Sequence, residues 1–300
     1  MVTTKSVLII GGSGFIGTHL ALKLRENYKV FTTYNTQYLP IAGVTAIPMS
    51  LQSRNWIKRV VYTAHPEVII YVAGKNDVEW AENNSRMAEN VHTAGPATVS
   101  NVAEILQPKF IFLSNCYAFD GQHGNYHEAD ITLPQTNLGR AKVGGENFIR
   151  GKSLNYTIVR ASHVFGRGNI RNRSFLDRLR MSLDRGEKVE LPTTELHSWV
   201  PIGGLTDLIA RLVDSGPRNK VFHYGGLTKV TEFEFGKLFA KRFGYDPNLI
   251  LPKRYGNLMT DKPIYDYSLN CSQVVETLKV KPLLLEEGFD LFENELIAGL

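Results

Sequence analysis

The chain has 300 residues, of which 43% are hydrophobic and 21% are charged; this balance excludes a disordered chain and allows one large or two ordinary domains. The net charge of +5 permits attraction to anions without selecting among them. The densest basic stretch, residues 167–188, is diluted by acidic residues and has no interleaved aromatic residues, so nucleic-acid binding is not expected.

Membrane insertion, secretion and metal binding find no support in the sequence. No run approaches the roughly 18 to 20 apolar residues that a membrane span requires, and the first residues lead into a strand rather than a signal peptide. The two cysteines, Cys116 and Cys271, lack the spacing of a zinc site or of a disulfide framework. We therefore predict a cytoplasmic protein with no membrane contact, no metal and no disulfide.

Short apolar runs alternate with longer mixed segments over the first half of the chain. The apolar runs predict buried strands at residues 7–10, 30–33, 68–72, 110–113 and 156–160. Apolar residues at three- and four-residue spacing predict helices at residues 17–27, 55–64, 88–106 and 138–151. Such alternation is typical of βαβ units, so we predict an α/β fold in which residues 1–165 form a Rossmann-type doubly wound parallel sheet.

The regular alternation stops after about residue 165. A loop rich in Gly, Arg and Asn follows, then a helix predicted near residues 174–185 and short elements separated by prolines. We interpret residues 166–300 as a smaller C-terminal α/β lobe that binds substrate, with some segments returning to pack on the Rossmann domain. Ligands of doubly wound folds bind at the carboxyl ends of the strands, so the site is expected at that edge.

A glycine-rich turn follows the first predicted strand and opens a helix, with Gly11, Gly14 and Gly17 in GxxGxxG spacing. Glycines allow positive φ and close backbone approach, while free N–H groups and the helix dipole attract a pyrophosphate. The pattern predicts a dinucleotide site; a tight turn without a ligand is the alternative. The second strand ends at Tyr34 and Asn35, which offer neither the acidic group typical of NAD sites nor the basic group typical of NADP sites. The predicted cofactor is therefore NAD or NADP.

Several blocks in chain order carry a resemblance to a known family. They are residues 66–74, 78–82, 90–91, 113–121, 144–146 and 159–166. With the glycine-rich turn they resemble the extended short-chain dehydrogenase/reductase (NAD-dependent epimerase/dehydratase) superfamily. The nearest branch is that of the dTDP-4-dehydrorhamnose reductases and the related regulatory β subunit of methionine adenosyltransferase. The resemblance spans nearly the whole chain.

The resemblance implies where the ligands of this chain bind. The implied cofactor-binding residues are Gly11, Ser13, Gly14, Phe15, Ile16, Gly17, Tyr34, Asn35, Ala73, Gly74, Lys75, Leu113, Lys142, Ala161 and Ser162. The implied substrate-binding residues are Asn115, Cys116, His163, Arg173 and His197. The implied substrate is a small molecule, a sugar nucleotide or another keto sugar, and homodimers are common in the family.

The chain departs from the family at the catalytic positions. Leu138 stands where the family has the tyrosine that donates a proton, and a leucine has no ionisable proton to give. Asn115 stands where a serine or threonine would hydrogen-bond the substrate carbonyl. Lys142 is kept and implies a contact with the nicotinamide ribose; a surface lysine is the alternative. Lys75 and His163 are the candidates for a substitute proton donor.

Two functional hypotheses therefore stay open. The first is a reductase- or epimerase-like enzyme that binds NAD(P), acts on a nucleotide-linked or other keto sugar and uses an atypical proton donor. The second is a catalytically silent NAD(P)- or nucleotide-sugar-binding protein that regulates or scaffolds a partner. His197, which replaces an arginine that often meets a nucleotide phosphate in the family, implies a rebuilt substrate pocket under either hypothesis.

Overall fold

A computed structural model of the protein describes residues 5–152, 155–253 and 265–294. Its centre is a seven-stranded sheet with the order β11-β6-β5-β4-β1-β2-β3, and every neighbouring pair runs parallel. The strands are β1 (Ser6–Ile10), β2 (Lys29–Tyr34), β3 (Val44–Pro48), β4 (Val68–Tyr71), β5 (Lys109–Asn115), β6 (Tyr156–Ala161) and β11 (Lys220–Tyr224). The predicted Rossmann-type doubly wound sheet is confirmed.

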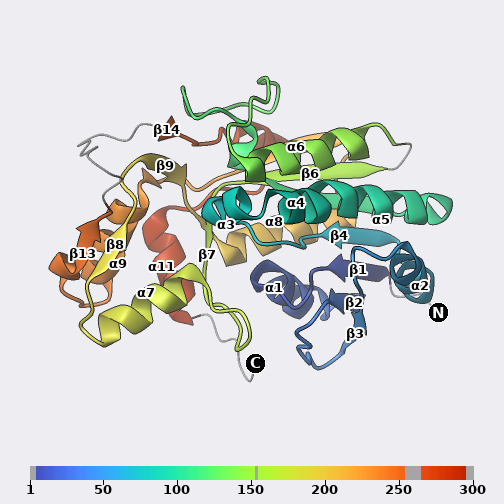
Figure 1. The fold of residues 1–300 in the computed structure, drawn as a ribbon, viewed down its shortest axis with the longest axis horizontal. Helices are drawn as coiled ribbons and strands as arrows, with labels where there is room; N and C mark the ends of the chain where they lie inside the picture. The colour runs from blue at the N-terminus through green and yellow to red at the C-terminus, as the bar shows by residue number, and fades with distance from the viewer. Residues whose placement is uncertain (1–4, 153–154, 254–264, 295–300) are drawn as a thin grey trace.

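Helices cover both faces of this sheet (Figure 1). Side chains of β1 alternate between two cores: Val7 and Ile9 face α1 (Phe15–Leu24) and α8 (Ile202–Ser215). Leu8 and Ile10 face the opposite core, which is built by α2 (Arg54–Ala64), α5 (Gly95–Ala103) and α6 (Asn137–Arg150). The strands are buried on both sides, which explains why they read as continuous apolar runs.

One helix was predicted as continuous, but the structure divides it into shorter elements. Residues 88–106 were expected to form a single helix, but the segment divides into α4 (Ser85–Glu89), the π-helical turn η1 (Asn90–Ala94), α5 and the 3₁₀ turn η2 (Glu104–Leu106). Pro96 lacks the N–H that would continue the α-helical hydrogen bonding across this point. The short helix α3 (Val78–Asn83) precedes α4.

The second lobe has its own apolar core of aromatic residues, among them Phe165, Trp199, Phe235, Phe239 and Phe289. Its larger helices are α7 (Phe175–Asp184), α9 (Glu232–Arg242) and α11 (Leu285–Asn294). Small sheets join its strands: β7 (Val164–Phe165), β8 (Val189–Leu191), β9 (Glu195–Ser198), β10 (Val200–Pro201), β12 (Lys229–Val230), β13 (Ile250–Pro252) and β14 (Tyr265–Asp266).

Segments from the second half of the chain also take part in the central sheet. β11 pairs with β6, α8 packs on α1, and α10 (Ser272–Leu278) contributes to the same core. The division of the chain near residue 165 stays a prediction.

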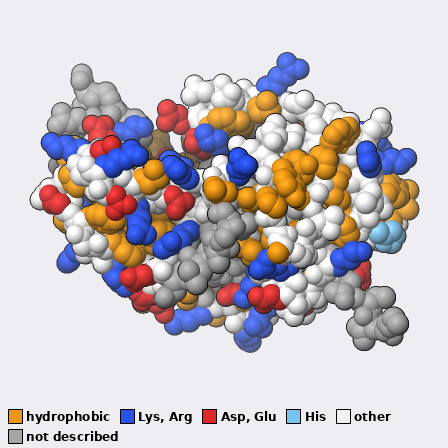
Figure 2. Space-filling view, turned by 90° about the horizontal axis from the view of Figure 1, so that it is seen from below, with side chains coloured by type: hydrophobic (Ala, Val, Ile, Leu, Met, Phe, Trp, Pro, Cys, Tyr) orange, Lys and Arg blue, Asp and Glu red, His pale blue; other side chains and the backbone are white. Residues whose placement is uncertain are grey.

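In the described part of the chain, no helix is both long enough and apolar enough to cross a membrane. On the face shown in Figure 2, basic and acidic side chains are interspersed.

A buried ion pair fixes α6 to the sheet beside the candidate site. The Arg160 guanidinium on β6 donates to the Glu146 carboxylate on α6 at 2.7 and 3.0 Å, and both side chains are almost fully buried. The guanidinium also lies over the Phe119 ring, 5.1 Å from its centroid. The pair therefore holds the helix that carries Leu138 and Lys142 against β6.

We expect Glu146→Ala to lower the free energy of unfolding by about 3–5 kcal/mol, because it leaves a buried guanidinium without its carboxylate. Urea denaturation followed by circular dichroism measures the change. Arg150→Ala is the control: this half-exposed residue also contacts Glu146, at 3.5 Å, and its loss should cost less than about 1 kcal/mol. Equal small losses in both variants would contradict this role for the buried pair.

Candidate functional site

The glycine-rich turn joins β1 to α1. The backbone requires glycine at some of its positions but not at all of them. A Cβ on Gly11, whose φ is +92°, would lie 2.6 Å from the Ala73 Cα, and a Cβ on Gly17 would lie 2.2 Å from the Gly11 carbonyl oxygen. Those two glycines are required by the turn itself. Gly14 has an ordinary φ of −76°, and a Cβ there would meet only the Gly11 oxygen, at 3.2 Å.

Gly14 is the N-cap of α1, and it has no side chain to cap the helix. The first amide groups of a helix have no partner within the helix, and the positive end of the helix dipole lies at this point. Phe15 and Ile16, in the first turn, are half-buried. An anionic phosphate therefore fits the residues present at this turn.

A loop of the second lobe is fastened to the same turn. The side-chain amides of Asn169 and Asn172 donate to the Ser13 carbonyl oxygen at 3.1 and 2.8 Å, and Asn169 also donates to the Thr18 hydroxyl at 2.7 Å. The loop's richness in asparagine is visible in the sequence, but no local pattern indicates these contacts. They fix the backbone of the turn before any ligand binds.

Other expected cofactor residues lie at or just after the carboxyl ends of β2 and β4. Tyr34 is half-buried and Asn35 is exposed at the end of β2. Ala73 and Gly74 follow β4, and Gly74 has a φ of +107°, with the His92 ring where a Cβ would lie. Lys75 is largely exposed, and its ammonium pairs with the Asp77 carboxylate at 3.3 Å.

Lys142 is buried on α6, so the alternative of a surface lysine is wrong. Its ammonium donates to the Leu113 carbonyl oxygen at 2.8 Å, at the end of β5. Burial lowers the pKa of Lys142 to about 7, because desolvation of the charged amine outweighs the nearby Glu146 carboxylate. The side chain thus lies where β5 and α6 meet, beside the expected cofactor residue Leu113.

Neither replaced catalytic position carries an acid. Leu138 is fully buried in an apolar cluster that includes Tyr117 and Phe119. The Asn115 amide donates to the Asn76 side-chain oxygen at 2.8 Å, and its own oxygen accepts the Tyr117 N–H at 3.1 Å. Both side chains are therefore occupied by contacts within the protein.

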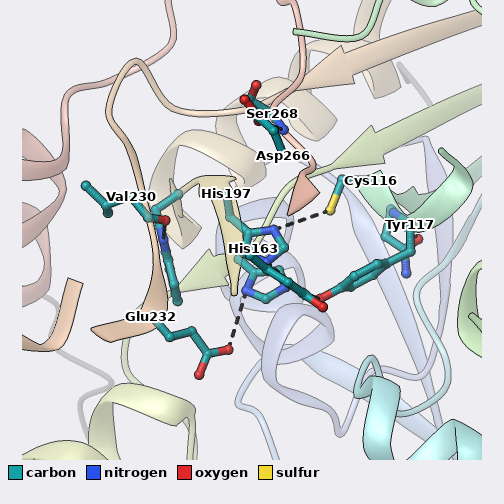
Figure 3. A network of polar contacts seen from close by, with 11 residues as sticks. Cys116, Tyr117, His163, His197, Val230, Glu232, Asp266 and Ser268 are labelled. Carbon is teal, nitrogen blue, oxygen red and sulfur yellow. Dashed lines mark hydrogen bonds and ion pairs between the residues drawn. The ribbon is translucent and has the colours of Figure 1, made fainter. Parts of the chain in front are cut away.

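A cluster of ionisable groups lies where β5 and β6 end against the second lobe (Figure 3). We call it the histidine cluster; its members are Tyr117, His163, Glu195, His197 and Glu232. The two imidazole rings stack with centroids 3.6 Å apart and planes 11° from parallel. The Tyr117 hydroxyl lies 2.8 Å from a Glu195 carboxylate oxygen and 3.1 Å from His163 Nε2.

The hydrogen bonds of the cluster assign its protons. Tyr117 has a single O–H, which it donates to the Glu195 carboxyl group. His163 Nε2 must then carry the hydrogen that the Tyr117 oxygen accepts, which leaves a lone pair on His163 Nδ1. Burial and the neighbouring His197 lower the pKa of His163 well below its ordinary value, so its ring is neutral.

The expected substrate residues fall into two groups. Asn115, Cys116, His163 and His197 lie together: Cys116 Sγ is 3.9 Å from His197 Nδ1, and His197 Nε2 is 3.2 Å from Glu195. His197 is only 1% exposed and stacks between His163 and Tyr267, so it is a poor phosphate ligand.

The remaining expected residues are placed as follows. Arg173 lies outside the cluster, at an exposed position just before α7, where its guanidinium contacts the Met181 sulfur at 3.1 Å. Ala161 is buried beside Asn115 in the sheet register, and the Ser162 hydroxyl is buried near the Cys116 thiol. Among the described residues, no group of three or more acidic, histidine or cysteine side chains is arranged to hold a metal.

Sequence reasoning did not identify Glu195 or Glu232 as site residues. Each is an isolated glutamate in a short segment of the second lobe, and no local spacing connects it to His163. Tyr117 is buried and also hydrogen-bonded within the histidine cluster.

A protein-family model described as "RmlD substrate binding domain" matches residues 5–289. The dTDP-4-dehydrorhamnose reductase of Mycobacterium tuberculosis is 24% identical over 286 residues, covering 93% of this chain and 89% of that protein. The bovine (Bos taurus) methionine adenosyltransferase 2 subunit beta is 23% identical over 298 residues, covering 93% of this chain and 84% of that protein.

Solved structures show the same fold. The dTDP-4-dehydrorhamnose reductase of Bacillus anthracis, solved in complex with NADP, superposes with a TM-score of 0.83 at 20% identity, covering 97% of this chain and 99% of that one. The UDP-glucose 4-epimerase of Thermotoga maritima, solved with UDP-glucose, has a TM-score of 0.82 at 23% identity, covering 96% and 97% of the two chains.

We expect Gly14→Asp to abolish binding of NADH and NADPH, because it places a carboxylate at the helix N-terminus where the cofactor phosphates would lie. The fold should survive, since the new Cβ has only one close contact. Isothermal titration calorimetry measures the affinity, with Gly151→Asp as the control; there a Cβ would have no contact closer than 3.5 Å. Unchanged affinity in Gly14→Asp would show that the turn does not bind the cofactor.

Proposed function

The chain belongs to the RmlD substrate binding domain family, within the extended short-chain dehydrogenase/reductase superfamily, and on that premise we propose an NAD(P)-dependent reductase or epimerase-like enzyme. Its proposed substrate is a nucleotide-linked or other keto sugar, and its proton donor is a residue other than tyrosine. The observation that carries the proposal is the histidine cluster, which gathers ionisable groups at the carboxyl ends of β5 and β6 while Leu138 is sealed in the apolar core.

The cofactor would be held by the glycine-rich turn and by the ends of the neighbouring strands. Gly14 and the first turn of α1 would bind the pyrophosphate, and Lys142 would contact the nicotinamide ribose. A bound nicotinamide cofactor supplies the hydride chemistry, while the protein positions the reactants and provides the proton. Relatives solved with NADP and with NAD support both cofactors, and no charged side chain at Tyr34 or Asn35 favours one of them.

Loss of the tyrosine slows the reaction but does not prevent it. General acid catalysis typically contributes about 10²- to 10⁴-fold to a rate, so another acid or water at the same place can sustain turnover. Of the two substitutes expected from the sequence, Lys75 is an exposed ammonium paired with Asp77. His163 lies within the histidine cluster, which makes it the better placed of the two.

A second function has support in the packing around Leu138. A leucine that is fully buried among apolar side chains is an established part of the core, as expected if proton transfer is no longer required of this position. Under this alternative the chain is a catalytically silent NAD(P)- or nucleotide-sugar-binding regulator or scaffold. One relative is named as a subunit of methionine adenosyltransferase 2.

The quaternary structure and the cellular location remain predictions. A homodimer is proposed from the family resemblance, and the cytoplasmic location stays a prediction from the sequence. Neither the enzyme nor the regulator proposal depends on them.

An oxidation assay separates the two functions. Wild-type protein with NADPH or NADH and dTDP-4-dehydrorhamnose as the probe should oxidise the cofactor if the chain is a reductase of that substrate class. In the same assay, Leu138→Tyr with Asn115→Thr should raise kcat about 10²-fold or more if no other residue supplies the proton, and should change it little if one does. The control is Leu138→Phe with Asn115→Thr, which adds a similar ring without the hydroxyl. No cofactor oxidation by wild type or by the restored variant would favour the silent protein.

A further inference from the structure

Glu232 lies at the start of α9, and it is the member of the histidine cluster that α9 of the second lobe supplies. Its Oε1 is 3.9 Å from His163 Nδ1, and its side chain is 26% exposed. Figure 3 shows Glu232 reaching toward His163 from one side, while Tyr117 approaches the cluster from the other. Thr231 caps α9 and forms a capping box with Glu234, so the backbone that presents Glu232 is fixed.

The two carboxylates of the cluster have opposite hydrogen-bonding environments. Glu195 accepts hydrogen bonds from the Tyr117 hydroxyl and from His197 Nε2. Glu232 faces the Nδ1 lone pair of a neutral His163, which can accept a hydrogen bond but cannot donate one. A neighbouring lone pair and a neighbouring carboxylate both favour the protonated form of Glu232.

Other charges around Glu232 come from several elements. The carboxylates of Glu195 and Asp77 favour its protonated form, while the cations of Lys253 and Arg178 favour the carboxylate. Burial is the largest influence, and together with the Glu195 charge it raises the pKa of Glu232 from 4.5 to about 7. A carboxyl group with that pKa can both hold and release a proton at neutral pH.

We propose that Glu232 is the catalytic acid of this site and gives its proton to the carbonyl oxygen of the substrate, the step for which the family uses tyrosine. This inference depends on the proposed reductase function. As the hydride adds to the carbonyl carbon, the C=O π electrons move to the oxygen, which takes the proton from the Glu232 carboxyl group. The ketone would become an alcohol with the hydride that a bound reduced cofactor supplies, and Glu232 would be left as a carboxylate that solvent reprotonates through its exposed side.

His163 acts in this scheme as a positioning residue. Its Nε2–H is held by the Tyr117 oxygen, and Tyr117 is held in turn by Glu195, so the lone pair of Nδ1 is directed at Glu232. The distance of 3.9 Å exceeds a hydrogen bond, so a small rotation of the glutamate or one bridging water must close it. The chain Glu195–Tyr117–His163 thus keeps a hydrogen-bond acceptor facing Glu232.

The first test uses Glu232→Gln, which keeps the shape of the side chain and removes the acid. Infrared difference spectra recorded across the neutral pH range should show a protonated carboxyl band that titrates in the wild type and is missing from Glu232→Gln. Glu190→Gln, on the exposed edge of β8, is the matched control and should keep the band. A wild-type spectrum without such a band, or a band that survives in Glu232→Gln, would overturn the proposal.

The second test measures turnover of dTDP-4-dehydrorhamnose. Glu232→Gln should lower kcat about 10²- to 10⁴-fold, with cofactor affinity unchanged, and should remove the fall in rate that the wild type shows as pH rises through neutrality. Full activity in Glu232→Gln would reject Glu232 as the acid and leave the reductase function standing. A wild type that binds NADPH and NADH but turns over nothing, or binds neither, would reject the reductase function and this inference with it.

Discussion

The parallel sheet brings the carboxyl ends of all its strands to one edge, and the whole candidate site depends on that constraint. The glycine-rich turn follows β1 and Lys75 follows β4. Asn115 ends β5, Tyr117 follows it, and His163 follows β6. Residues that are far apart in sequence therefore meet at one place. The second lobe meets the same edge with β9 and α9, which supply Glu195 and Glu232.

At this edge a single hydroxyl proton orders the polar groups. Tyr117 can donate once, and its donation to Glu195 sets the tautomer of His163 and leaves Glu232 facing a lone pair. The two glutamates thereby have different hydrogen-bonding environments, and such differences are how proteins tune carboxyl groups for acid chemistry. The buried Arg160–Glu146 pair stabilises this arrangement, because it holds α6 against β6, the strand that leads to His163.

Much of the fold could be predicted because its signals are local. The apolar runs of β1, β4 and β5 are buried on both faces, and the turn at Gly11 requires a positive φ that glycine permits. The short edge strand β3 was missed, since none of its residues is fully buried. Glu195 and Glu232 were missed for a different reason: their role comes from contacts with residues of another lobe, which no local pattern encodes.

The central claim is that the glycine-rich turn still binds a nicotinamide cofactor although the family's tyrosine is gone. Titration of the wild-type protein with NADPH and with NADH, followed by cofactor fluorescence, tests it directly. We predict saturable binding of at least one of the two, since Gly14 leaves the N-terminus of α1 without a side-chain cap and the first amide groups of a helix have no partner within it. No saturation with either cofactor at millimolar concentration would contradict it and leave the sheet as a scaffold without a nucleotide.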